Sequence, residues 1–369
     1  MAKDTKDKVT FFSPKKGELC DYKPTSKTRL VEAVDILSKL KTEVIHITKD
    51  SMFCINDEHT LAITVLFKLG VEGCVDRKEF KNIIKLVPEE FSTSLSNEGL
   101  EFHWDGNSTK IPIVNEDYTV DWNLGEEEAE YKGNKFFTSL FLGGCAVSTD
   151  FDNRLGQIAF DYETIASSDN VMLCEQVYKG EEQDCLTIFA LSGKAFELWR
   201  NINLPSKYLA VYENGNRFMI RDDIIIWDKS KYNDNAKVNN AIKAKVDAFI
   251  HEHKKRFKFP EETWKALKMF KGCKELIIKN NEIKVSGNVS LKKSTNIVPF
   301  DNDREEFVVN TKQLFRLENL TTSNSDFSVV TIQDGPYYKK YLYVDPDPGL
   351  KETTIILAGI CEEMKYNDN

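Results

Sequence analysis

The sequence predicts an α+β protein made of three tandem domains, each with two helices packed on antiparallel sheets. The chain of 369 residues is too long for one ordinary hydrophobic core. Six segments have the apolar spacing of amphipathic helices, and strand-like runs with turn residues lie between them. Because each helix must bury its apolar stripe, we expect it to cover one face of a sheet.

The helical segments recur along the whole chain. They cover residues 29–41, 77–87, 132–147, 193–202, 261–274 and 311–320. In the second segment Phe80, Ile84 and Val87 fall at helical spacing, and Trp264 and Leu267 do so in the fifth. A helix followed by several strands is therefore the repeating unit.

Local signals mark where the elements begin and turn. Asp76 and Asn310 stand just before the second and sixth helical segments, where an N-cap is expected. Between helices the apolar pattern alternates with period two, which is typical of strands. Turn residues predict hairpins at 214–215, 280–281 and 334–336.

Two repeats per domain give the predicted domain boundaries. The domains are expected at residues 26–126, 127–250 and 251–361. An N-terminal extension at 1–25 and a polar C-terminal tail at 362–369 complete the chain.

Composition argues against several functional classes. The eight cysteines include no C-x-x-C pair, so we expect no metal site and no disulfide framework. The N-terminus lacks an apolar signal segment and no run is long enough to cross a bilayer, so a cytoplasmic protein without membrane contact is expected.

Catalytic motifs do not stand out either. No phosphate-binding glycine motif occurs, and no Ser/His/Asp arrangement has supporting context, so we expect neither an enzyme nor a cofactor. The pair His251 and His253 lacks a visible third ligand and is interpreted as part of a linker. Residues 345–349 are interpreted as a turn dictated by proline and glycine.

The charges are segregated along the chain. The six helical segments carry seventeen basic and seven acidic residues, a net of +10, whereas the whole chain has a net charge of −9. Arg77, Lys81 and Lys85 lie four residues apart, as do Lys312 and Arg316, so each set lies on one side of its helix. Ordinary solvation of exposed helices explains any single case. A positive surface inside an acidic protein instead suits a phosphate backbone bound without base specificity.

A family resemblance rests on the order and spacing of several stretches. They are "RLVEAVDILSKL", "VDRKEFKNIIKLVPEE", "NRLGQIAFDYETIASSDNVML", "FALSGKAFELWRNI", "YLAVYENGNRFMIRDDIII", "EEFVVNTKQLFRLENL" and "KETTIILAGI". Together they resemble the bacterial DNA sliding clamp, the β subunit of the replicative DNA polymerase. The resemblance covers nearly the whole chain past residue 25, and no stretch is diagnostic alone.

The resemblance implies a DNA clamp fold and a ring. In that family two chains pair head to tail, and the helices of six domains line a channel around duplex DNA. Here the channel candidates would be Arg77, Lys78, Lys81, Lys85, Lys135, Lys194, Arg200, Lys265, Lys268, Lys312 and Arg316. A homodimer that binds double-stranded DNA, a DNA polymerase and a clamp loader is the implied assembly, with no cofactor.

The resemblance also implies two protein-binding sites. A partner pocket would be lined by Leu155, Thr164, Ser167, Met172, Leu173, Ile242, Ile355, Leu357 and Ile360. Core packing is the alternative explanation for these residues. Ile111 and Ile113, near an edge-strand candidate, are expected at the joint between the two chains.

The sequence departs from the family at two places. The family usually has a Gly-His-Arg run where this chain has residues 169–171, and the usual terminus is replaced by "LAGICEEMKYNDN". A divergent member, such as one from a large bacteriophage, is expected to differ in this way. Two other functions stay open: a clamp-fold docking platform for transcription or repair factors that does not encircle DNA, and an enzyme on a repeated α+β scaffold.

Overall fold

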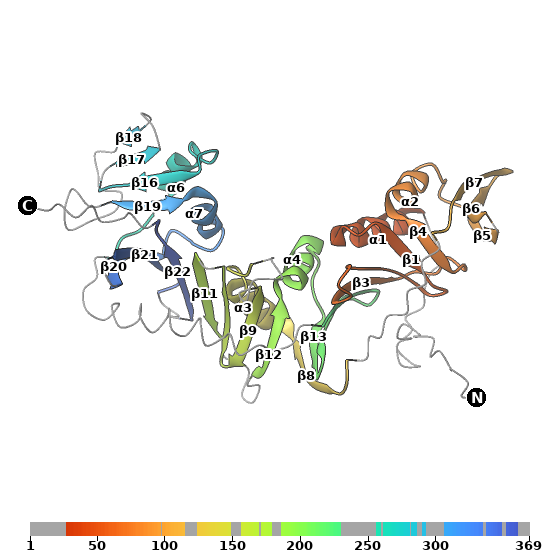
Figure 1. Ribbon diagram of the computed structural model, residues 1–369, viewed down its shortest axis with the longest axis horizontal. Coiled ribbons are helices and arrows are strands. Elements are labelled where there is room, and N and C mark those ends of the chain that lie inside the picture. Colours follow the sequence, from red (N-terminus) through yellow and green to blue (C-terminus); the bar gives the residue numbers. More distant parts are fainter. Residues whose placement is uncertain are drawn as a thin grey trace, which may run out of the picture. The chain divides into compact units, whose positions relative to one another are not determined.

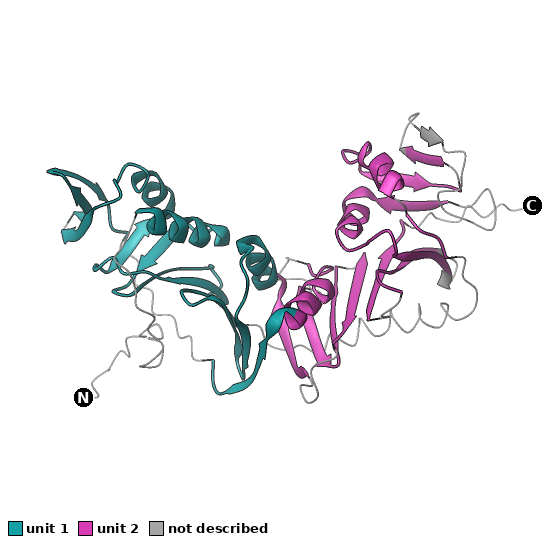
Figure 2. Cartoon of the chain, turned by 180° about the vertical axis from the view of Figure 1, so that it is seen from behind, with its two compact units in different colours: residues 1–134, 194–231 teal, residues 135–193, 232–369 magenta. Residues whose placement is uncertain are grey.

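The computed structural model describes most of the chain. The described residues are 27–96, 98–114, 124–148, 156–169, 171–178, 186–229, 256–259, 261–280, 282–285, 290–292, 306–334, 337–348 and 352–360. Helices alternate with antiparallel strands along the chain (Figure 1), which confirms the predicted α+β class. The chain divides into two compact units, residues 1–134 with 194–231 and residues 135–193 with 232–369 (Figure 2).

The first unit contains an eight-stranded sheet and a three-stranded sheet. Its elements are α1 (Lys27–Leu37), the 3-10 helix η1 (Ser38–Leu40), β1 (Val44–Ile47), β2 (Ser51–Ile55), β3 (Leu61–Leu66), β4 (Gly73–Asp76), α2 (Arg77–Ile83), β5 (Ser92–Ser96), β6 (Gly99–Trp104), β7 (Asn107–Ile111), β8 (Glu127–Lys132), α4 (Gly193–Ile202), β13 (Tyr208–Tyr212), β14 (Gly215–Arg221) and β15 (Ile224–Asp228). The large sheet has the order β4-β1-β2-β3-β15-β14-β13-β8, and the small one is β5-β6-β7.

The second unit contains a seven-stranded sheet and a four-stranded sheet. Its elements are α3 (Gly133–Gly143), β9 (Gln157–Tyr162), β10 (Thr164–Ser168), β11 (Met172–Val177), β12 (Leu186–Ser192), α6 (Glu261–Lys268), β16 (Glu275–Ile278), β17 (Glu282–Val285), β18 (Ser290–Lys292), β19 (Phe307–Asn310), α7 (Thr311–Glu318), β20 (Asp326–Asp334), β21 (Tyr337–Asp345) and β22 (Thr353–Ala358). The sheet orders are β12-β9-β10-β11-β22-β21-β20 and β18-β17-β16-β19.

Each large sheet joins strands that are far apart in the sequence. In the first unit β3 pairs with β15, with Ile63 opposite Ile226. In the second unit β11 pairs with β22, with Met172 opposite Leu357. Strands assigned from the sequence to neighbouring domains therefore share one sheet within each unit. The three-domain division stays a prediction, and the predicted terminal extensions at 1–25 and 362–369 lie outside the described residues.

Side-chain caps begin two of the helices as predicted. The Asp76 carboxylate accepts a hydrogen bond of 2.8 Å from the backbone N–H of Glu79 at the start of α2. At α7 the Asn310 side-chain oxygen accepts one of 2.9 Å from the backbone N–H of Lys312. Each cap satisfies a backbone donor that the first helical turn leaves without a partner.

The predicted hairpin at 214–215 is confirmed, and its glycine has a steric reason. Tyr212 pairs with Gly215 across the turn between β13 and β14. A Cβ atom at Gly215 would lie 2.4 Å from the backbone oxygen of Asp228 on the neighbouring strand β15. Any larger residue would therefore push these strands apart.

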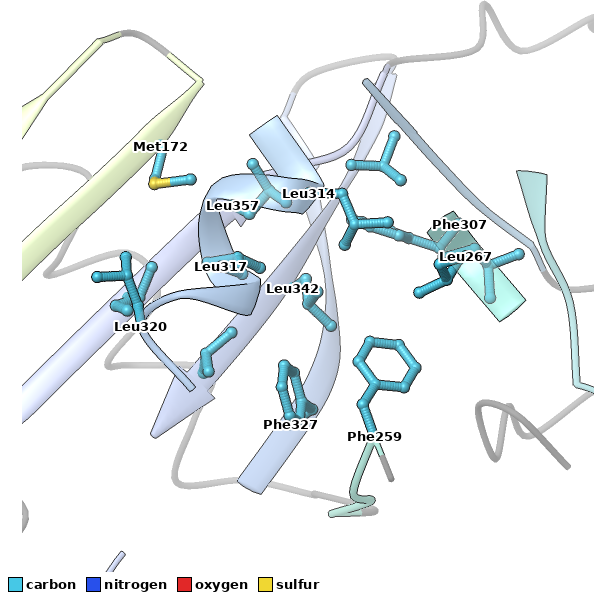
Figure 3. Close-up of a cluster of buried hydrophobic side chains, with 14 of the residues drawn as sticks. Met172, Phe259, Leu267, Phe307, Leu314, Leu317, Leu320, Phe327, Leu342 and Leu357 are labelled. Atoms are coloured by element: carbon cyan, nitrogen blue, oxygen red, sulfur yellow. The ribbon is translucent and has the colours of Figure 1, made fainter. Parts of the chain in front are cut away.

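The apolar stripes of α6 and α7 pack into one core of the second unit. Trp264, Leu267, Leu314 and Leu317 belong to this buried cluster, so the predicted apolar face of the fifth helical segment is confirmed. Figure 3 shows leucines of α7 next to Leu342 and Leu357 of the large sheet. Burial of this many large apolar side chains is the main stabilising contribution to the unit.

Asp345 provides a pH-dependent test of this core. Asp345 is buried, and this burial raises the pKa of its carboxyl group. Arg256 lowers the pKa, whereas Asp326, opposite Asp345 on β20, raises it. Because the pKa of Asp345 is higher in the folded than in the unfolded chain, its ionisation lowers the free energy of unfolding at a pH above the folded-state pKa. Below the ordinary pKa of 3.8 the carboxyl group is protonated in both states, and this loss of stability is absent.

We therefore expect Asp345→Asn to raise the thermal unfolding midpoint at pH 7, because it removes a poorly solvated charge. The gain should vanish as the pH falls below about 4. Thermal melts followed by circular dichroism at both pH values measure this, with the exposed Asp222→Asn as a control. An unchanged or lower midpoint at pH 7 would contradict it.

Candidate nucleic-acid interface and partner site

Most of the predicted DNA contacts are exposed on the surface of their unit. The exposed ones are Lys78, Lys85, Lys135, Arg200, Lys265, Lys268 and Lys312. All except Lys85 lie on a helix, and Lys85 comes directly after Ile84, the C-cap of α2. Helices α2 and α4 belong to the first unit and α3, α6 and α7 to the second, so each unit presents basic helices of its own.

Four of the lysines form ion pairs at the surface. The pairs are Lys81–Asp35 at 2.7 Å, Lys194–Glu58 at 3.7 Å, Lys265–Glu261 at 2.8 Å and Lys268–Glu318 at 2.6 Å. Exposed pairs of this kind contribute little to stability and are screened by salt. A phosphate group can therefore compete with these carboxylates for the lysines.

Two arginines of the predicted interface bind within the chain instead. Arg77 donates from Nε to the backbone oxygen of Thr42. Arg316 donates from Nη1 to Asp169 at 2.5 Å, and from Nη2 to the backbone oxygen of Cys145. Because both guanidinium groups are engaged in holding the fold, this geometry speaks against their predicted role as phosphate contacts.

The predicted partner pocket combines residues from two faces of one sheet. Met172, Ile355 and Leu357 are buried in the core cluster around α6 and α7. Leu173 instead packs with Ile356 in a separate cluster, because successive residues of a strand point to opposite faces. The predicted set therefore cannot form one wall, and core packing is the role of its inner members.

The remaining pocket candidates differ in what they offer to a partner. Ser167 is fully buried, and its hydroxyl donates to the backbone oxygen of Gly143 and accepts from the N–H of Ala146. Thr164 is partly buried at the start of β10, and Ile360 is 40% exposed just beyond β22. Leu155 and Ile242 lie outside the described residues.

Val171, directly before Met172, is an apolar residue that sequence reasoning did not name as a partner contact and that the fold leaves partly exposed. It is partly buried against the core, and its backbone oxygen accepts a hydrogen bond of 2.7 Å from the N–H of Ala358. Ile360 follows two residues later, and its N–H bonds to the oxygen of Val308. We therefore take Val171, together with the already predicted Ile360, as candidate partner contacts in place of the buried Met172 and Leu357. The position of Val171 just after β10, next to the predicted contact Met172, was the signal in the sequence that could have identified it.

Ile111 and Ile113 pack within the chain. Ile111 is fully buried and lies opposite Leu100 in the small sheet of the first unit. Ile113 forms a bridge with Val75 on β4, and the next N–H, from Val114, donates to the oxygen of Cys74. These residues attach the small sheet to the edge of β4, so the prediction that they form a joint between chains does not fit their environment.

Two exposed apolar side chains are better candidates for a joint between chains. Leu86, after α2 in the first unit, is 70% exposed, and Met269, after α6 in the second unit, is 74% exposed. Both fall outside the apolar stripe of their helical segment. The signal that could have identified Leu86 and Met269 is that each is a large apolar residue on the polar side of its helical segment.

One thiol lies close to an imidazole in the first unit, in the pair Cys74 and His46. The thiol of Cys74 lies 3.0 Å from Nδ1 of His46, but burial, with a further contribution from His59, lowers the pKa of His46 to about 4. The imidazole is therefore neutral and cannot stabilise a thiolate beside it. Burial raises the pKa of the Cys54 thiol to about 12.

The described residues contain neither a cluster of metal ligands nor a helix that could span a membrane. No group of three or more His, Cys, Asp or Glu side chains there is arranged to hold a metal ion. None of the described helices combines the length and the hydrophobicity that crossing a bilayer requires.

Comparison with known proteins gives structural matches only. No family model matches the chain, and no curated protein does. The DNA polymerase III β subunit of Thermotoga maritima aligns with a TM-score of 0.64 and 13% identity, over 91% of this chain and 98% of that one. The Pseudomonas aeruginosa β subunit gives 0.62 and 11%, and the Helicobacter pylori β clamp bound to a DNA ligase peptide gives 0.59 and 14%, with the same coverage. The chain thus has the fold of the bacterial DNA polymerase sliding clamps.

Proposed function

We propose that this protein is a DNA sliding clamp, a processivity factor without catalytic activity of its own. Two chains would associate head to tail into a ring that encircles duplex DNA and tethers a DNA polymerase. The observation that carries the proposal is the clamp fold, matched over 91% of the chain, together with exposed lysines on its helices.

The charge distribution supports a role on DNA. Exposed cations on α2, α3, α4, α6 and α7 stand out in a chain of net charge −9. An acidic body repels DNA, whereas a basic channel attracts phosphates whatever the base sequence. Each lysine contact is weak and exchangeable, which permits the ring to slide.

Exposed apolar groups support a ring of two chains. Leu86 belongs to the first unit and Met269 to the second. We assign both side chains to the joint of a head-to-tail contact between the first unit of one chain and the second unit of another. Burying them there would stabilise the association.

A partner surface is the third part of the proposal. The Helicobacter pylori clamp binds a DNA ligase peptide and small aromatic compounds such as carprofen and diflunisal. In this chain we assign the corresponding role to the surface around Val171 and Ile360, where a polymerase or a clamp loader would dock. The assembly would act in the cytoplasm.

The main alternative is a clamp-fold docking platform that never encircles DNA. The engagement of Arg77 and Arg316 within the fold favours this alternative, because it reduces the positive charge available to phosphates. The two functions differ in the assembly that they require.

Light scattering on the purified protein at micromolar concentration tests the proposal. We expect a mass of two chains in the absence of DNA, because the ring must exist before it slides. A protein that stays monomeric at high micromolar concentration would favour the docking platform.

A further inference from the structure

The turn between β10 and β11 is held by the carboxylate of Asp169. Oδ1 of Asp169 accepts hydrogen bonds from the backbone N–H groups of Val171, at 3.1 Å, and Met172, at 2.7 Å. The side chain is only 12% exposed. One carboxylate oxygen therefore fixes the local path of the turn, as aspartates in turns commonly do.

The other oxygen of Asp169 binds helix α7. Oδ2 accepts from Nη1 of Arg316 at 2.5 Å, and Nε2 of Gln313 lies 3.5 Å away. The second terminal nitrogen of Arg316 donates to the backbone oxygen of Cys145, just after α3. A single guanidinium group thus ties together the turn, α7 and the end of α3, which are far apart in the sequence.

The same turn carries the accessible apolar group of the partner surface. The backbone oxygen of Val171 bonds to Ala358 at the end of β22, and Ile360 is exposed two residues further on. The position of the turn therefore sets where Val171 lies relative to Ile360. A second anchor, the buried hydroxyl of Ser167, holds the end of β10 to Gly143 and Ala146.

From these contacts we infer that Asp169 and Arg316 are positioning residues of the partner surface, holding the turn that carries Val171 in its binding position before a partner arrives. This inference rests on the proposed function, since it assumes that a partner docks at Val171 and Ile360. Charge-assisted hydrogen bonds to a mostly buried carboxylate are strong enough to fix a short turn. A surface fixed in advance loses less conformational entropy on binding.

Three substitutions separate the contacts. Asp169→Asn keeps an oxygen acceptor for the N–H groups of Val171 and Met172 but loses the charge that faces Arg316. Arg316→Gln removes both guanidinium bonds, whereas Arg316→Lys keeps the charge but cannot reach Asp169 and Cys145 together. Lys271→Gln, in the same unit, is the matched control because it also removes one positive charge and its side chain is exposed.

Two quantities should be measured for each variant at a temperature where circular dichroism shows it fully folded. The first is amide hydrogen exchange at Val171 and Met172, and the second is affinity for the DNA ligase peptide and for diflunisal, the probes taken from the Helicobacter pylori clamp. We expect Arg316→Gln and Asp169→Asn each to speed exchange and weaken binding roughly ten-fold. Their double variant should be no weaker than either alone, because they remove one shared interaction. Arg316→Lys should lie between, and Lys271→Gln should match the wild type.

The outcomes distinguish this inference from the proposed function. Unchanged exchange and affinity in Arg316→Gln would overturn the inference, as would faster exchange with unchanged probe affinity. If the wild type forms dimers but binds neither probe, the partner surface and the inference built on it are both contradicted. The dimers would still support the proposed ring. A monomeric wild type that binds the probes and responds as expected would support the inference and contradict the ring.

Discussion

Replacing Met269 by Asp is expected to convert a dimer into monomers without unfolding the chain. Met269 is 74% exposed, so the substitution should cost the isolated chain little. At a joint between chains the same change removes an apolar contact worth about 1.5–3 kcal/mol and places a carboxylate in an apolar contact. The dissociation constant should rise by at least about 100-fold. Light scattering across a dilution series measures it.

A matched control for this experiment lies in the same unit. Ile188 on β12 is also an exposed apolar residue, at 43%, and Ile188→Asp should leave the dimer intact. Leu86→Asp, from the first unit, should behave like Met269→Asp, because the two residues would meet at the same joint. Dimers that survive both Met269→Asp and Leu86→Asp would show that the joint lies elsewhere.

Removing exposed lysines from the helices is expected to weaken DNA binding in a salt-dependent way. In the triple variant Lys78→Gln, Lys85→Gln and Lys312→Gln, the dependence of log affinity on log salt should become shallower by about 0.9 per lost phosphate contact. Within the described residues, none of these three lysines has an ion pair whose loss would disturb the fold. Equilibrium binding to short linear duplex DNA between about 50 and 200 mM salt gives the slope.

The control for this variant removes the same charge from strands and loops. Lys68, Lys110 and Lys207 are exposed, and changing all three to Gln also lowers the net charge by three. If the helix lysines contact phosphate, only the first variant changes the slope. Equal effects of both variants would mean that DNA responds to net charge alone.

Local patterns in the sequence predicted the elements well. The spacing of Trp264 and Leu267 and the caps Asp76 and Asn310 depend on neighbours within a turn or two of helix, and all are confirmed. Helix ends were less accurate. The helix predicted over 77–87 ends at Ile83, although Ile84 and Val87 of its predicted apolar stripe are still buried.

The sequence is least informative about the sites where long-range contacts decide the environment of a residue. The spacing of Arg316 along α7 indicates a basic helix face, but it cannot reveal that Asp169 lies beside it. Likewise the apolar run at Met172 and Leu173 does not say which strand pairs with it, or what covers each face. Strand pairing and charge partners depend on the tertiary fold, so only the structure could assign them.

Encirclement of DNA is the central claim, and it is tested most directly by topology. The protein should be mixed with linear duplex DNA, the DNA ends ligated to form a circle, and the sample diluted at moderate salt. Retention of the protein on the circle is then measured before and after one cut linearises the circle. We predict that the circle retains the protein and that the linear DNA loses it, because a closed ring leaves only over an end. Equal retention on both forms would contradict encirclement, since phosphate contacts alone do not distinguish a circle from a line.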